Sequence, residues 1–123
     1  MRSISRLLIL LAVTAACGTA GEVVPMPPSM VGTWSTDDAR YEGRFFELSP
    51  TTLVIGTGDG RATSYSVTAL YLTQDEQGRD VHRVDYVDSG TTQSMAFYFS
   101  VAEPGGALRM RNQPTIVWRK SRG

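Results

Sequence analysis

The sequence predicts an all-β domain, a small antiparallel up-and-down barrel of about eight strands, and two observations carry this prediction. Short runs of apolar, β-branched and aromatic residues recur from residue 31 onward, separated by clusters of Gly, Pro, Asp and Ser, and no stretch keeps a helical period. Most of these breaks are short enough to be hairpin loops, so neighbouring strands should be antiparallel. A sandwich of two packed β-sheets is the alternative architecture.

Eight runs are expected to be strands, in the order Val31 to Ser35, Arg44 to Leu48, Thr52 to Thr57, Arg61 to Thr73, Arg79 to Val87, Thr91 to Ala102, Ala107 to Arg111 and Thr115 to Lys120. A break that contains residues typical of turns separates each run from the next. Together they are expected to form one domain over residues 30–123, which is long enough to bury a single core.

The last hairpin should have a three-residue loop at residues 112–114. This loop places Leu108 opposite Trp118 and Met110 opposite Ile116, so the apolar residues share one face. A two-residue loop shifts the register by one and mixes apolar with charged residues on each face, which a half-buried sheet disfavours.

The turn at residues 88–90 allows two registers. A three-residue loop has good turn chemistry but directs charged residues of the preceding strand toward the apolar face that contains Phe97. A two-residue loop directs Val84 and Tyr86 to that face instead, together with His82. We favour the two-residue loop, and the direction of His82 stays open.

The first 16 residues have the three parts of a secretory signal peptide, namely a basic start, a short apolar stretch and small residues before a cleavage point. The basic residues are Arg2 and Arg6. The apolar stretch has about ten residues, half of the roughly 20 that a membrane-spanning helix requires. A permanent transmembrane anchor is therefore not expected.

Cys17 is the only cysteine and directly follows Ala15 and Ala16. These residues resemble the lipobox of bacterial lipoproteins, although Thr14 stands where leucine is usual. The resemblance implies that Cys17 becomes the first residue of the mature protein and carries acyl chains, and two or more chains attach a protein stably to a membrane. Cys17 also has no second cysteine with which to form a disulfide.

The resemblance also implies a location in the cell envelope. In lipoproteins of Gram-negative bacteria, a neutral second residue such as Gly18 accompanies transport to the outer membrane. Cleavage by an ordinary signal peptidase after Ala16 or Ala20 is the alternative, and it would leave a soluble secreted or periplasmic protein.

Residues 17–29 are expected to be the lipidated cysteine and a short tether. The tether contains Pro25, Pro27 and Pro28, which oppose helix formation and favour an extended, semi-rigid spacer. Such a spacer would hold the domain away from the membrane surface.

The charge balance and the small number of reactive residues exclude several classes of function. Without the signal peptide, ten basic residues face twelve acidic ones, which argues against a nucleic-acid partner. His82 is the only histidine and no nucleophile motif accompanies it, so no enzymatic activity is expected. His82 and Asp80 share a strand face, but two ligands make a weak site, so we expect no metal and no cofactor. An enzyme that uses His82 and nearby acids is nevertheless kept as a further hypothesis.

The first expected strand opens with Gly32-Thr33-Trp34. This resembles the Gly-x-Trp opening of lipocalins, in which the tryptophan closes one end of the barrel and an arginine of the last strand packs across it. Arg119 is the matching position here. The resemblance implies that the barrel binds a small apolar ligand.

The residues expected to face inward are bulky, and this argues against a ligand inside the barrel. An eight-stranded barrel holds either packed side chains or one small ligand. The residues expected inside are Phe46, Leu48, Ile55, Tyr65, Val67, Phe97, Phe99, Leu108, Met110, Ile116 and Trp118.

The sequence therefore favours a non-enzymatic, lipid-anchored protein that binds a protein or an envelope component through its surface. Its expected partners are the membrane, through the lipidated N-terminus, and an unidentified protein or envelope component. The alternative is a lipocalin-like carrier of a small apolar molecule. A dry cavity of a few hundred cubic ångströms favours the carrier, whereas a packed interior favours surface binding.

Overall fold

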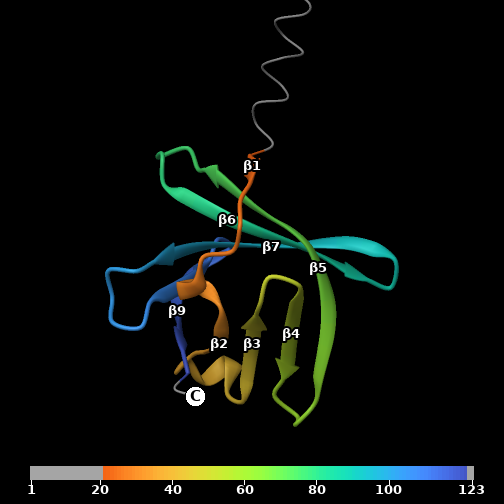
Figure 1. Cartoon of the computed structure of the whole chain (residues 1–123). Helices are drawn as coiled ribbons and strands as arrows, with labels where there is room; N and C mark the ends of the chain where they lie inside the picture. Colours follow the sequence, from red (N-terminus) through yellow and green to blue (C-terminus); the bar gives the residue numbers. More distant parts are fainter. Residues whose placement is uncertain (1–20, 122–123) are drawn as a thin grey trace, which may run out of the picture.

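Residues 21–121 are described by the computed structural model of this chain, and Cys17 and the predicted signal peptide lie outside them. The elements, labelled in Figure 1, are β1 (Glu22–Val23), η2 (Pro28–Met30), β2 (Gly32–Ser35), η3 (Ala39–Tyr41), β3 (Arg44–Leu48), β4 (Thr52–Thr57), β5 (Ala62–Gln74), β6 (Asp80–Asp88), β7 (Thr91–Ser100), β8 (Ala107–Met110) and β9 (Gln113–Lys120). Here η denotes a single 3₁₀ turn. All eight predicted strands are present, and β3 and β4 have the predicted bounds.

The eight strands from β2 to β9 form a closed antiparallel barrel. Each strand pairs with the next along the chain, and β9 pairs back with β2. This confirms the all-β, up-and-down barrel and excludes the two-sheet sandwich. β5 is the longest strand, and its two halves have different partners: the first pairs with β4 and the second with β6.

The segment before β2, predicted as part of a tether, lies against the barrel. β1 adds to the second half of β5, and the backbone N–H of Val24 donates to the carbonyl of Leu70 over 2.9 Å. Pro28 begins η2, where its missing N–H costs nothing, and Met30 at the end of this turn is fully buried. The packed chain thus begins at Glu22 rather than at residue 30.

Packed side chains fill the interior of the barrel. Trp34 stacks on Phe46 with ring centroids 6.5 Å apart and meets Phe99 edge-on at 6.0 Å. Phe46 also contacts Trp118, at 5.1 Å. Of the residues predicted inside, all except Tyr65 belong to this core or pack against it, and Tyr65 contacts Tyr86. The fully buried members are Met30, Trp34, Leu48, Leu53, Val84, Phe97 and Leu108.

The β6–β7 hairpin has the favoured two-residue loop. Ser89 and Gly90 have φ angles of 52° and 81°, the left-handed pair that a type I′ turn requires. Val84 accordingly lies opposite Met95, and His82 lies opposite Phe97. The turn therefore settles the direction of His82, which belongs to the inward face.

The β8–β9 hairpin confirms one predicted pair and corrects the other. Leu108 lies opposite Trp118, but Met110 lies opposite Gln113 rather than Ile116, so the loop has two residues. The prediction assumed one constant register. The β8–β9 register shifts between Leu108 and Met110, so β9 has more residues than β8 between the two observed pairs. Ile116 and Trp118 are nevertheless both buried.

Replacing Met30 tests whether the N-terminal segment belongs to the core. Met30→Ala should lower the free energy of unfolding by about 2–5 kcal/mol, because truncation of a fully buried side chain leaves a cavity. Val23→Ala is the control, since 65% of Val23 is exposed, and it should change little. Urea denaturation measures both variants, and an equally small effect from the two would contradict the packing described above.

An apolar pocket at the mouth of the barrel

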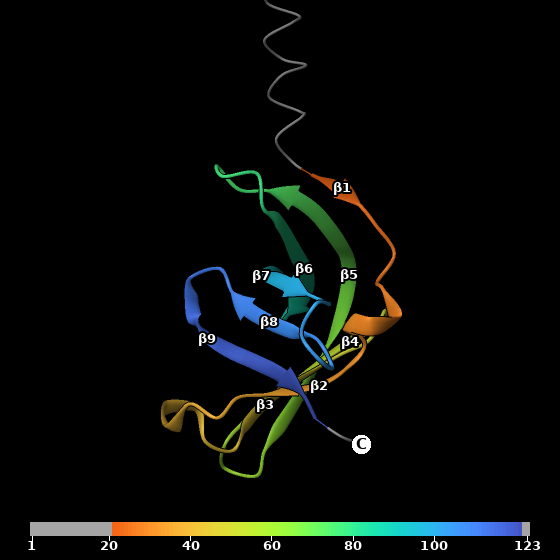
Figure 2. The same cartoon turned by 90° about the vertical axis from the view of Figure 1, so that its left-hand side faces the viewer.

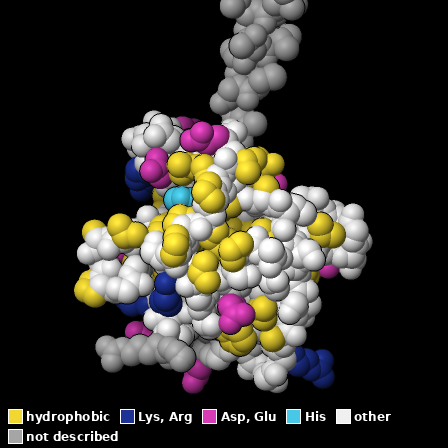
Figure 3. All heavy atoms as spheres, in the orientation of Figure 1, with side chains coloured by type: hydrophobic (Ala, Val, Ile, Leu, Met, Phe, Trp, Pro, Cys, Tyr) yellow, Lys and Arg dark blue, Asp and Glu magenta, His cyan; other side chains and the backbone are white. Residues whose placement is uncertain are grey.

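The barrel has two unlike ends. The N-terminal segment, residues 22–30, crosses one of them between β5 and β2 (Figures 1 and 2). Hydrophobic side chains gather on this face (Figure 3), where Val23 and Val31 are exposed. The other end, here called the mouth, is bordered by the loops at residues 36–43, 58–61, 89–90 and 111–112.

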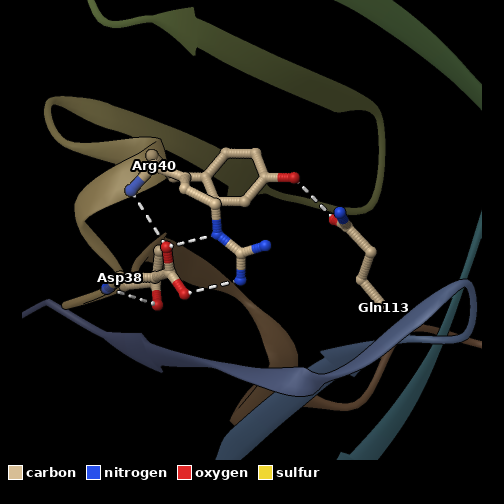
Figure 4. Close-up of polar contacts among 5 residues, drawn as sticks. Asp38, Arg40 and Gln113 are labelled. Carbon is tan, nitrogen blue, oxygen red and sulfur yellow. Dashed lines mark hydrogen bonds and ion pairs between the residues drawn. The ribbon is translucent and has the colours of Figure 1, made fainter.

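A single 3₁₀ turn, η3, lies over the mouth. Asp38 caps this turn: its carboxylate accepts the backbone N–H of Arg40 over 2.9 Å and two side-chain N–H groups of Arg40 over 3.0 and 2.9 Å (Figure 4). The hydrogen bonds from Arg40 lower the pKa of Asp38 to about 2. Tyr41 ends the turn, and its hydroxyl donates to Oε1 of Gln113 in β9 over 2.7 Å (Figure 4). The turn is thereby tied to β9, the strand that pairs with β2.

Beneath Tyr41 lies a pocket of about 200 Å³. A cavity of about 150 Å³ can hold benzene, whereas sites for drug-sized ligands are about 300–1,000 Å³. The pocket therefore fits one aromatic ring or one branched side chain. Arg44 is the one charged residue that lines it. The lining residues are Tyr41, Arg44, Phe45, Phe46, Ile55, Gly56, Thr57, Met95, Met110 and Trp118.

The pocket continues into a second depression across the mouth. Met95 and Met110 line both hollows. The second also contains Arg111, from the β8–β9 turn. The two hollows together are called the mouth groove, and Arg44 lines the first hollow and Arg111 the second. Methionine side chains are flexible and polarizable, so a floor built from two of them adapts to different apolar groups.

The two arginines of the mouth groove differ from the others in the described chain. The other arginines within residues 21–121 each pair with a carboxylate at 2.8 to 3.9 Å. Arg44 and Arg111 make no such pair with any described residue. The hydrogen bond from the Thr57 hydroxyl is the main cause of the lowered pKa of Asp59, and the charge of Arg44 adds to it. The mouth groove thus carries positive charge beside an apolar floor.

The predicted Gly-x-Trp residues lie at the end opposite the mouth. Trp34 is fully buried, and its Nε1–H donates to the carbonyl of Met30 over 3.0 Å. Lys120 lies over the Trp34 ring, with Nζ 5.6 Å from the ring centroid, and donates to the carbonyl of Ser29 over 2.7 Å. Gly32 has φ 144°, and a Cβ there would come within 3.1 Å of the Lys120 chain.

Lys120 therefore occupies the place predicted for Arg119. In β9, residue 120 lies opposite Trp34, whereas Arg119 lies opposite Ser35 and turns to the outer face because side chains alternate along a strand. Arg119 instead donates to Glu103 over 3.1 Å. The register of β9 against β2 decides which basic residue covers the tryptophan, and this register was not visible in the sequence.

His82 lies among apolar rings at the far end from the mouth. It stacks on Phe97 with ring centroids 6.0 Å apart and meets Phe99 edge-on at 6.1 Å. Its Nδ1 is buried without a hydrogen-bond partner among the described residues. Burial lowers the pKa of His82, and the charge of Asp80 opposes this shift. The imidazole therefore packs as a neutral ring.

Residues 21–121 contain no group of three or more His, Cys, Asp or Glu side chains arranged to hold a metal ion. Over the same residues, no helix has the length and apolar character needed to cross a membrane. Fold and site together define a small closed β-barrel with an apolar groove at its mouth. No protein family, curated protein or solved structure matches this chain.

The half-buried His82 predicts a decline of stability in acid. The unfolded chain binds a proton near the ordinary pKa of 6.5, whereas the folded chain resists protonation at that pH. The contribution of neutral His82 to the free energy of unfolding should therefore be fully present above pH 6.5. It should decrease as the pH falls toward the lower pKa that His82 has in the folded chain. Urea unfolding between pH 8 and 5 measures this, with His82→Phe as the variant that should lose the dependence. Parallel curves for the two proteins would show that another group is responsible.

Proposed function

We propose that this chain is an exported, lipid-anchored binding protein without enzymatic activity, which recognises a protein or envelope component through the mouth of its barrel. One observation carries the proposal: the interior is filled with side chains, and the apolar hollow that remains opens at the mouth surface. The pocket beneath Tyr41, of about 200 Å³, takes a single side chain of a partner, and the adjoining hollow of about 650 Å³ leaves room for the rest of a bound segment.

The position of β1 supports an orientation for the anchored protein. Glu22 follows Cys17 by five residues (22 − 17), which span at most about 18 Å when extended. Acyl chains on Cys17 would therefore hold the β1 end of the barrel close to the membrane. Along β5, Tyr71 beside β1 is nine residues (71 − 62) from Ala62 at the mouth, which is at most about 30 Å because β5 bends at its bulge. The mouth would then face away from the membrane, where a partner can reach it.

The proposed location is the cell envelope and, from the resemblance at Gly18, the outer membrane. A soluble secreted or periplasmic protein is the alternative if an ordinary signal peptidase cleaves the chain.

The mass of the mature protein tests the anchor. Protein extracted from the envelope should begin at Cys17 and carry the added mass of acyl chains. The Cys17→Ala variant should lose that mass and should move from the membrane fraction to the soluble fraction. An unmodified mature chain beginning at Gly21 would refute the lipid anchor.

Site-specific photo-crosslinking in intact cells tests the binding surface. A crosslinker at Asn112, in the mouth loop, should capture an envelope protein or component. The same group at Ser66, an exposed position of β5 away from the mouth groove, is the matched control and should capture little. Equal capture from both positions, or capture from Ser66 alone, would contradict recognition through the mouth.

The pocket itself keeps a second function under consideration, the binding of a small apolar molecule. Organic-solvent extraction of purified protein, followed by mass spectrometry, distinguishes the two. A single apolar compound present at about one molecule per chain would support the carrier, and an empty extract would support surface binding.

A further inference from the structure

The mouth groove combines three properties that together specify a ligand chemistry. Its pocket has an apolar lining sized for one ring or one branched side chain. Its floor contains Met95 and Met110, which line both hollows. Arg44 lines one hollow and Arg111 the other, and these are the two arginines of the described chain without a carboxylate partner.

We propose that the mouth groove binds a short protein segment that inserts one aromatic or branched apolar side chain and carries carboxylates on both sides of it. This inference rests on the proposed surface-binding function and names its partner chemistry. The pocket takes the apolar group, and the two guanidinium groups receive the flanking carboxylates, because arginine binds carboxylates through parallel hydrogen bonds.

The acidic groups at the mouth are Asp37, Asp38, Glu42, Asp59 and Asp88, and two of them pair with the other two arginines of the mouth. Asp38 already holds Arg40 through two side-chain hydrogen bonds. Asp59 accepts the hydroxyl of Thr57 over 2.6 Å and the backbone N–H of Arg61 over 3.0 Å. Both carboxylates are engaged within their own loops, whereas Arg44 and Arg111 have no comparable partner among the described residues.

The tie between Tyr41 and Gln113 limits what can enter. Tyr41 lies against Trp118, with ring centroids 5.7 Å apart, and its hydroxyl donates to Gln113 in β9. A long acyl chain or a sterol exceeds this pocket of about 200 Å³, so the rest of it would have to displace these contacts or lie in the second hollow, beside Arg111 and Asn112. A single side chain fills the pocket while this tie stays in place, and this favours a protein segment over a lipid.

Methyl NMR of methionine tests the proposal with controls inside the same molecule. The whole chain carrying Cys17→Ala, labelled at the methionine methyl groups, is titrated with the peptide acetyl-Glu-Phe-Glu-amide. Met95 and Met110 in the groove should shift saturably, whereas Met26 and Met30, which pack with the N-terminal segment, should not. Equal shifts at all four, or no saturation at millimolar peptide, would overturn the proposal.

Three related probes separate charge from apolar contact. Acetyl-Lys-Phe-Lys-amide should bind about five-fold more weakly at low salt, a difference that should vanish at 1 M salt. Acetyl-Glu-Ala-Glu-amide should bind too weakly to saturate, because it leaves the pocket unfilled. Phenylacetate represents a free apolar acid, and tighter binding of phenylacetate than of the peptide would replace the protein segment by a small molecule.

Matched variants assign the charge preference to the two arginines. The double variant Arg44→Gln, Arg111→Gln should bind the acidic and basic peptides equally. Arg61→Gln, also an arginine at the mouth but one near Asp59, should keep the preference. An unchanged preference in the double variant would overturn the proposed chemistry.

The peptide experiment and the crosslinking experiment test different claims, so either one can give a negative result without the other. Capture of a partner from Asn112 without peptide binding would reject the acidic-apolar chemistry and leave recognition through the mouth in place. Peptide binding without capture of any envelope partner would reject the proposed function instead.

Discussion

The pairing of β9 with β2 is the constraint on which the rest of this structure depends. It closes the sheet, so β2 and β9, which would otherwise be its free edges, satisfy each other's backbone hydrogen bonds. Closure also directs every second side chain into one enclosed volume, which aromatic and aliphatic residues fill. The same pairing brings Lys120 opposite Trp34, and the Lys120 amine then binds the Ser29 carbonyl and joins the N-terminal segment to the barrel.

Because the barrel interior is filled, a binding site is expected on the surface, and the two ends of the barrel differ in structure. The end near β1 is covered by residues 22–30 and leads, five residues back, to the proposed anchor at Cys17. The mouth keeps an apolar groove beneath Tyr41, flanked by Arg44 and Arg111. One end is thus suited to attachment and the other to recognition, an arrangement consistent with a protein that presents its binding surface away from a membrane.

Much of the fold was predictable because local patterns carry it. Alternating apolar residues and turn-forming breaks located all eight barrel strands, and Ser89-Gly90 chose a two-residue turn by its own conformational preference. The errors came from long-range effects. An irregular β8–β9 register changed the partner of Met110, and the β2–β9 register placed Lys120 rather than Arg119 over Trp34. β1 was missed because two residues without a periodic pattern become a strand only when β5 offers them an edge.

The sequence by itself determined the fold class, the closely packed character of the interior and, through Cys17, the expectation of an anchor, because each depends on residue types at short spacing. Only the tertiary structure decided the site. Tyr41, Phe46, Ile55, Met95 and Trp118 come from four strands and one loop, and they meet because the barrel closes. No spacing along the chain reveals that two arginines 67 residues apart (111 − 44) border one groove, since their proximity follows from strand register and curvature.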